Sequence, residues 1–227
     1  SDAEGQALFK PRSTRLHAVT WKAKHAAQKQ LYEAVTDYVR HGYNQAMAAK
    51  QRHIGFLMIL MQRLVTSSTA AIRATLERRQ ALLDNPEPQA GLFDPMDAAE
   101  WAELDGQSQV DAALKSSSWA QEKSEVDMLL ALAQETEQQG ADAKAEALLE
   151  LIYKLQQEEK DPELKVLVFT EFVPTQAMLE EFLESRGFSI ALLNGRMDLE
   201  ARTNAQKAFS QNVRILISTD AGGEGLN

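Results

Sequence analysis

The last third of the chain alternates three short apolar runs with two helical patterns. The apolar runs cover residues 165–170, 189–193 and 213–217, and the helical patterns cover residues 174–186 and 198–210. Continuous apolar runs of this length are typical of strands buried on both faces, as in a parallel sheet. A β-α-β-α-β order also requires crossover connections, which are right-handed in nearly all proteins. The sequence therefore predicts an α/β fold with a parallel β-sheet in this part of the chain.

Polar residues end or follow each of the three apolar runs, and glycine follows the second and third. The carboxyl ends of parallel strands meet at one rim of the sheet, where α/β proteins bind their ligands. We therefore expect a group of rim residues from three loops: Thr170 and Glu171, then Asn194, Gly195 and Arg196, then Ser218 and Thr219. Hydroxyls, an amide, glycine backbone and one arginine suit a phosphodiester chain. Taken singly, each residue has a structural explanation, such as a helix cap or a turn, so the prediction depends on the shared pattern.

The third run continues into the loop Ser-Thr-Asp-Ala-Gly-Gly-Glu-Gly-Leu-Asn, residues 218–227. Glycines at 222, 223 and 225 allow backbone amides to approach a phosphate closely. The sequence stops inside this loop, and we expect it to be a fragment of a longer protein.

The first two thirds of the chain have mostly helical patterns. We expect residues 1–19 to be irregular, with a short strand at 16–20, and residues 84–118 to form a loop-rich acidic connector. Helices are predicted over residues 22–43, 46–65, 70–83, 122–139 and 141–159, the last two separated by Gly140.

The charge of the chain, −9 overall, is unevenly distributed. Residues 1–90 carry 13 basic and 7 acidic side chains, whereas residues 91–160 carry 5 and 16. A basic first part is compatible with phosphate contacts, and equally with lysines and arginines on the wet faces of helices. The absence of cysteine excludes disulfides and thiolate metal sites. Without an 18-residue apolar run or a signal peptide, we expect an intracellular protein with no membrane contact, cytoplasmic if the source is bacterial.

Three segments resemble motifs IV, IVa and V of the Swi/Snf-type branch of superfamily-two helicases. They are Lys-Val-Leu-Val-Phe-Thr-Glu-Phe, Leu-Asn-Gly-Arg-Met, and Ile-Leu-Ile-Ser-Thr-Asp-Ala-Gly-Gly-Glu-Gly-Leu-Asn. The resemblance covers about the last third of the chain, and its last motif is far more specific than a lone Gly-x-Gly. The helical first third, with Gln62-Arg63-Leu64 and Ser67-Ser68, resembles the helical insertion that precedes the second RecA-like lobe, and its details are most similar to those of bacterial members.

The resemblance implies the second RecA-like lobe of an ATP-driven translocase on double-stranded DNA. The domains would be a helical insertion (1–90), an acidic loop-rich connector and helix (91–140), and the truncated lobe (141–227). The residues near DNA phosphates would be Thr170, Asn194, Gly195, Arg196, Ser218 and Thr219. The residues linking this site to the nucleotide would be Asp220, Gly223, Glu224 and Gly225. The parent protein would use ATP and Mg²⁺, pair this lobe with a first RecA-like lobe, and offer its helical region to a protein partner.

The chain departs from the family in what it lacks. It has no Gly-Lys-Thr phosphate loop and no Asp-Glu-x-His segment, and motif VI with its arginine fingers is absent. We therefore expect no catalytic residue here and no ATP hydrolysis by this chain alone. Two alternatives stay open: a non-catalytic nucleic-acid- or protein-binding helical module using the basic helices of residues 22–80, and a scaffold lobe of an RNA helicase.

Overall fold

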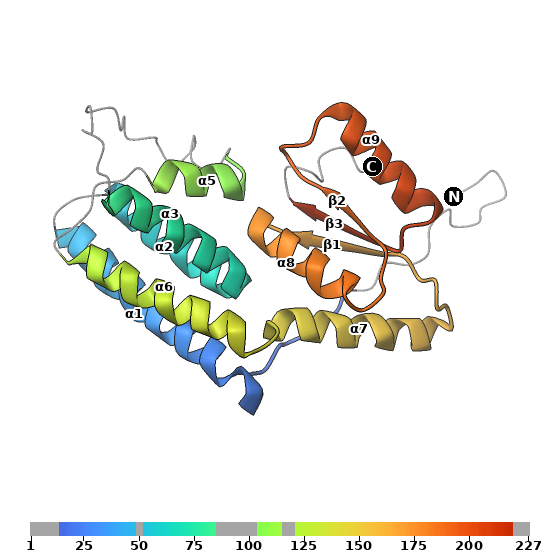
Figure 1. Ribbon diagram of the computed structural model, residues 1–227, viewed down its shortest axis with the longest axis horizontal. Coiled ribbons are helices and arrows are strands. Elements are labelled where there is room, and N and C mark those ends of the chain that lie inside the picture. The colour runs from blue at the N-terminus through green and yellow to red at the C-terminus, as the bar shows by residue number, and fades with distance from the viewer. Residues whose placement is uncertain (1–13, 49–51, 85–103, 115–120, 220–227) are drawn as a thin grey trace.

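A bundle of long helices and a small α/β layer lie side by side along the longest axis of the molecule (Figure 1). The computed structural model describes residues 14–48, 52–84, 104–114 and 121–219. The helical part consists of η1 (Ala23–His25), α1 (Ala26–Ala48), α2 (Arg52–Ser67), α3 (Thr69–Asp84), α5 (Gly106–Ala113) and α6 (Glu122–Gln139). The α/β part consists of α7 (Ala143–Glu159), β1 (Val166–Thr170), α8 (Val173–Glu184), β2 (Ile190–Leu193), α9 (Leu199–Gln211) and β3 (Ile215–Thr219).

One apolar core holds the bundle together. Helix α1 packs against α2 and α6, and α3 packs against α6. Val35, Leu57, Met61, Leu76 and Leu129 are fully buried in this core. The predicted helices are confirmed, with ends shifted by a few residues, and α6 shares the core of the first three. None of the described helices is both long and apolar enough to cross a membrane.

A buried ion pair crosses the bundle core. The Arg79 guanidinium donates to both Glu122 carboxylate oxygens, at 2.7 and 2.8 Å, and to the Leu114 carbonyl at 2.8 Å. The exposed fractions of the two charged side chains are 2% and 0%. Burial raises the pKa of Tyr38 well above its usual value, with the Glu122 charge adding to it, so this hydroxyl stays protonated and donates to Glu122. These bonds join α3, α6, α1 and the end of α5.

Helix α5 lies in the segment that we expected to lack regular structure, so that prediction was wrong for residues 106–113. The Asp105 side chain accepts the Ser108 backbone N–H at 2.7 Å and thereby caps the helix. Val110, Ala113 and Leu114 bury its inner face against the bundle. A helix of 8 residues makes just over two turns, too few to show a clear apolar period, and its stability depends on this packing. Residues 85–103 and 115–120 lie outside the described residues.

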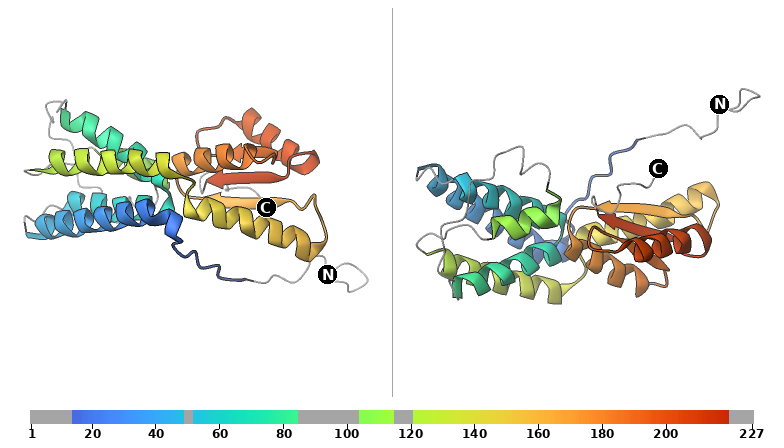
Figure 2. Two further views of the ribbon diagram at one scale, coloured as in Figure 1. Left: turned by 60° about the horizontal axis from the view of Figure 1, so that its bottom comes forward. Right: turned by 90° about the horizontal axis from the view of Figure 1, so that it is seen from above.

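The expected strand at residues 16–20 is also absent from the described structure, where residues 14–22 form neither helix nor strand. The segment instead runs alongside α7 (Figure 2). Lys22 pairs with Glu150 at 2.6 Å and Lys24 with Glu146 at 2.6 Å. Ion pairs between side chains therefore hold this segment against α7, where a strand would instead be held by backbone hydrogen bonds.

The sheet is parallel, as predicted, with the strand order β1-β3-β2. The crossover from β1 to β2 and the one from β2 to β3 run in opposite directions across the sheet. Right-handed crossovers then place α8 and α9 on opposite faces. The packing agrees, because α7 and α8 share one apolar cluster with the sheet and α9 shares another. Strand β3 lies in the centre and is buried along its whole length, as expected for the third apolar run.

Strand β1 was predicted to be buried on both faces, and this is wrong. Its residues alternate in burial, and Leu167 and Phe169 are 40% and 59% exposed. Since β1 is the edge strand and α9 packs against β2 and β3, this side of β1 has no covering helix among the described residues. The apolar run alone did not distinguish an edge strand from a central one.

Candidate nucleic-acid interface

The carboxyl ends of the three strands form one rim, as predicted. In the parallel register Thr170 pairs with Thr219, and Leu193 pairs with Ser218. The loop after β2, which begins at Asn194, therefore starts beside the end of β3 and on the same rim as the end of β1. The strand ends Thr170, Leu193 and Thr219 lie 23 and 26 positions apart in the sequence, and they meet here because the sheet aligns their strands.

The loop after β2 is held in place by a buried glutamine on α8. Gln176 is 1% exposed, and its amide donates to the Leu193 carbonyl at 3.0 Å and the Ile217 carbonyl at 2.8 Å. Its side-chain oxygen accepts the Asn194 amide at 3.0 Å, and the Asn194 oxygen accepts the Arg196 backbone N–H at 3.1 Å. Gln176 thus ties β2 to β3 and sets the orientation of the loop that carries Arg196.

Gln176 was missed in the sequence analysis. Gln176 stands three residues before Leu179, on the inward face of α8. A polar side chain at such a position usually has a buried hydrogen-bond partner, and this could have marked Gln176 as important from the sequence. Arg202, from α9, donates to the Asn194 carbonyl at 3.4 Å and supports the same loop from the other side.

Gly195, Arg196 and Thr219 line one hollow of about 180 Å³, together with Glu171 and residues of α5. The Arg196 side chain is 65% exposed, and its guanidinium lies 3.7 Å from the Asp111 carboxylate of α5. Thr170 lines a neighbouring hollow of about 690 Å³, which shares Glu171 with the first. The rim thus presents a guanidinium, glycine backbone and the partly buried Thr170 side chain, a combination that suits phosphate oxygens, while Thr219 lines the hollow with only 5% of its surface exposed.

Ser218 lies differently from what the sequence indicated. Its side chain is fully buried, and its hydroxyl donates to the Thr219 carbonyl at 3.0 Å, so in this conformation it is not presented to the rim. The predicted phosphate contact of Ser218 stays a prediction. Asp220, Gly223, Glu224 and Gly225 lie outside the described residues.

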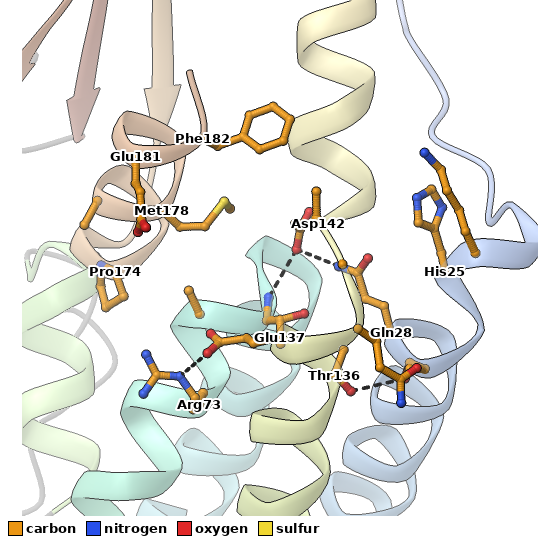
Figure 3. A pocket seen from close by; sticks show the side chains of 18 of the residues that line it. His25, Gln28, Arg73, Thr136, Glu137, Asp142, Pro174, Met178, Glu181 and Phe182 are labelled. Carbon is orange, nitrogen blue, oxygen red and sulfur yellow. Dashed lines mark hydrogen bonds and ion pairs between the residues drawn. The ribbon is translucent and has the colours of Figure 1, made fainter. Parts of the chain in front are cut away.

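Another hollow, of about 630 Å³, lies where the bundle meets the α/β part (Figure 3). Asp142, which caps α7, accepts the Gln28 amide at 2.6 Å and the Thr69 backbone N–H at 3.3 Å. Arg73 pairs with Glu137 across the same hollow at 2.7 Å. These polar groups join α1, α3, α6 and α7, and we interpret this hollow as a structural joint.

Ion pairs to Glu146 of α7 also hold the bundle and the α/β part together near the edge of this joint. Burial raises the pKa of Glu146, but hydrogen bonds from Lys24 and His25 outweigh it and leave the pKa lowered. His25 Nδ1 accepts the Lys22 backbone N–H at 3.2 Å, and Nε2 lies 2.9 Å from a Glu146 oxygen. This arrangement fits the tautomer with the proton on Nε2, donating to Glu146.

Neither a Gly-Lys-Thr phosphate loop nor a cluster of metal-ligating side chains is found among the described residues. The chain has no Gly-Lys-Thr loop, and no three His, Asp or Glu side chains of the described residues gather closely enough to hold a metal ion. We therefore derive no chemical step through ATP or Mg²⁺.

Residues 143–227 match the family model described as "Helicase conserved C-terminal domain". Over these residues the chain is similar to the C-terminal domain of helicases. The lobe is 38% identical over 87 residues to the ATP-dependent helicase rhp16 of Schizosaccharomyces pombe, covering 37% of this chain and 10% of that protein. It is 38% identical over 64 residues to the ATP-dependent RNA helicase DBP3 of Ajellomyces capsulatus, covering 28% of this chain and 13% of that protein. The chain therefore spans about a tenth of the length of these relatives.

The fold of the whole chain is also similar to parts of solved structures. It aligns with the C-terminal part of the Fun30 ATPase domain with a TM-score of 0.47 and 18% identity, covering 89% of this chain and 68% of that one. Independently of this structure, the family match over residues 143–227 agrees with the helicase lobe that the sequence motifs indicated.

Proposed function

We propose that this chain contributes the second motor lobe of a Swi/Snf-type, ATP-driven translocase on double-stranded DNA. In this proposal the strand rim binds the backbone of one DNA strand, and closing and opening against a first RecA-like lobe moves the protein along it. The helical bundle serves as the insertion before the lobe, which begins near Ala141. Such a motor acts inside the cell, on the nucleoid if the source is bacterial.

The observation that carries the proposal is that Gly195, Arg196 and Thr219 line the same hollow. A guanidinium forms charge-assisted bonds to phosphate oxygens, and neither it nor a threonine hydroxyl at the backbone reads base sequence. This chemistry suits a motor that must bind the phosphate backbone with the same affinity at every position along a duplex, whatever its base sequence. Beyond the described residues, we assign Asp220, Gly223, Glu224 and Gly225 to the coupling between this rim and the nucleotide.

The first test uses the longer protein that joins this lobe to its partner lobe. Arg196→Ala is expected to lower DNA-stimulated ATP hydrolysis at least tenfold while leaving the unfolding temperature unchanged, because the Arg196 side chain is exposed. Arg40→Ala is the matched control, since Arg40 is an equally exposed arginine that pairs with Asp37 on α1. Equal activity of the two variants would refute the role of the rim.

The second test separates duplex DNA from RNA. One relative of the lobe is named an RNA helicase, which favours RNA as the competing substrate. Stimulation of ATP hydrolysis by duplex RNA in preference to duplex DNA of the same length would replace the DNA proposal by the RNA one.

The third test concerns the isolated chain, which we propose to be inactive because it lacks the phosphate loop and the arginine fingers. Phosphate release by the purified 227 residues, with and without DNA, should equal the rate without protein. DNA-dependent release above that rate would contradict this part of the proposal.

The alternative of a basic helical binding module receives less support from the packing. Its three candidate arginines each face an acidic partner: Arg63 pairs with Glu171, Arg73 with Glu77 and Glu137, and Arg78 with Asp111. Arg73 is the most fully neutralised of the three because two carboxylates pair with it, whereas Arg78 shares the single carboxylate of Asp111 with Arg196.

A further inference from the structure

Asp111 of α5 lies between two arginines that come from distant parts of the chain. Its Oδ1 is 2.7 Å from Nη1 of Arg78 on α3, and its Oδ2 is 3.7 Å from Nη2 of Arg196 in the loop after β2. The Gln107 amide also donates to Oδ1, at 3.2 Å. One carboxylate therefore bridges the helical bundle and the strand rim.

Helix α5 is held close against the rim at its other end. Arg63 of α2 donates to the Gln109 side chain at 2.6 Å and pairs with Glu171, which directly follows β1. A Cβ atom at Gly106 would lie 2.5 Å from Glu171 Cγ and 3.0 Å from its backbone oxygen, so only glycine lets α5 approach this closely. The acidic residues Asp105 and Asp111 therefore line the same hollow as Arg196 and Thr219.

Arg78 and Arg196 also line a hollow of about 380 Å³ on the far side of Gln107. Their guanidinium groups converge on a position that an anion already fills, namely the Asp111 carboxylate. A phosphate offers oxygens of the same charge with similar spacing, and arginine forks bind both groups in the same way. All three side chains are partly exposed, between 44% and 65%, so a polymer phosphate can replace the carboxylate without unfolding the core.

We propose that Arg78 and Arg196 together bind one backbone phosphate of duplex DNA, and that Asp111 occupies this phosphate site while DNA is absent. The inference depends on the proposed function and extends it in two ways. It adds a residue of the helical bundle, Arg78, to the DNA-binding surface. It also makes α5 an acidic cover that DNA must displace from the strand rim.

The test measures binding of the full 227-residue chain to a fluorescein-labelled duplex DNA by anisotropy at salt concentrations from low to physiological. Asp111→Asn is expected to tighten binding by about three- to tenfold. DNA would then no longer have to break the two exposed ion pairs that Asp111 makes with Arg78 and Arg196. Arg78→Ala is expected to weaken binding and to reduce the slope of log affinity against log salt by about 1, as the loss of one phosphate contact does. In the Arg78→Ala background, Asp111→Asn should gain less than about twofold, because the stronger of its two pairs is already gone.

Matched controls separate this site from general charge effects. Asp37→Asn removes an acidic partner of an exposed arginine on α1 and should leave binding unchanged, as should Arg40→Ala. Thermal unfolding of each variant checks that the fold is kept. Equal gains for Asp111→Asn and Asp37→Asn, or the full gain of Asp111→Asn in the Arg78→Ala background, would overturn the inference alone. Failure of the chain and all of its variants to bind duplex DNA would overturn the inference together with the proposed function.

Discussion

Replacing Gln176 by leucine should remove the bonds that organise the strand rim while changing the side-chain volume little. The native amide makes three hydrogen bonds, of 2.8 to 3.0 Å, in a position that is 1% exposed. Each such bond contributes about 1 kcal/mol net, and a buried carbonyl that loses its donor costs more. Leucine offsets part of this loss by burying more apolar surface. We therefore expect the free energy of unfolding to fall by about 2–4 kcal/mol.

The assay is thermal or urea unfolding of the purified chain followed by circular dichroism. In a chain of this size, a loss of about 3 kcal/mol lowers the midpoint by roughly 6–12 °C. Gln139→Leu serves as the control, because Gln139 is exposed near the end of α6, where a substitution typically changes stability by less than about 0.5 kcal/mol. If both variants unfold at the same midpoint, Gln176 does not tie β2 to β3 in the way described, and the ordered loop after β2 needs another explanation.

Two further predictions concern the helical part and its joint with the lobe. Arg79→Ala leaves the Glu122 carboxylate buried without its partner and should lower the free energy of unfolding by about 3–5 kcal/mol in urea titrations, and a loss under 1 kcal/mol would contradict the buried pair. The pKa of Glu146 is lower in the folded chain than in the unfolded chain, where it is about 4.3. The ionised Glu146 therefore stabilises the fold above the unfolded pKa, and this stabilisation is lost as the pH falls through the lower pKa of the folded chain. Glu146→Gln should therefore flatten the decline of unfolding free energy below about pH 4.5, and an unchanged acid profile would refute this assignment.

The sequence predicted those features that depend on local pattern. The fully apolar third run appears as the central strand β3, and Gly140, with φ of +156°, separates α6 from α7 as expected. The convergence of Thr170, Asn194 and Thr219 followed from strand direction alone, because parallel strands end at one rim.

The features that were missed depend on partners far away in the sequence. Gln176 acts through carbonyls that lie 17 and 41 residues later, and no local pattern shows such a bond. Helix α5 gains its stability from packing on the bundle, and the role of Asp111 appears only once α3 and the loop after β2 are brought together. The exposure of Phe169 likewise depends on the position of β1 at the sheet edge, which an apolar run does not encode.

The account depends most on the claim that three strand-end loops form one DNA-binding rim. Its most direct test is the change in backbone amide NMR signals of the isotopically labelled chain when duplex DNA is added. The account predicts that the largest changes fall on Thr170, on residues 194–196 and on Thr219, and are absent from the outer face of α7. Changes that cluster on α1 or α7 and leave Arg196 and Thr219 unaffected would contradict it.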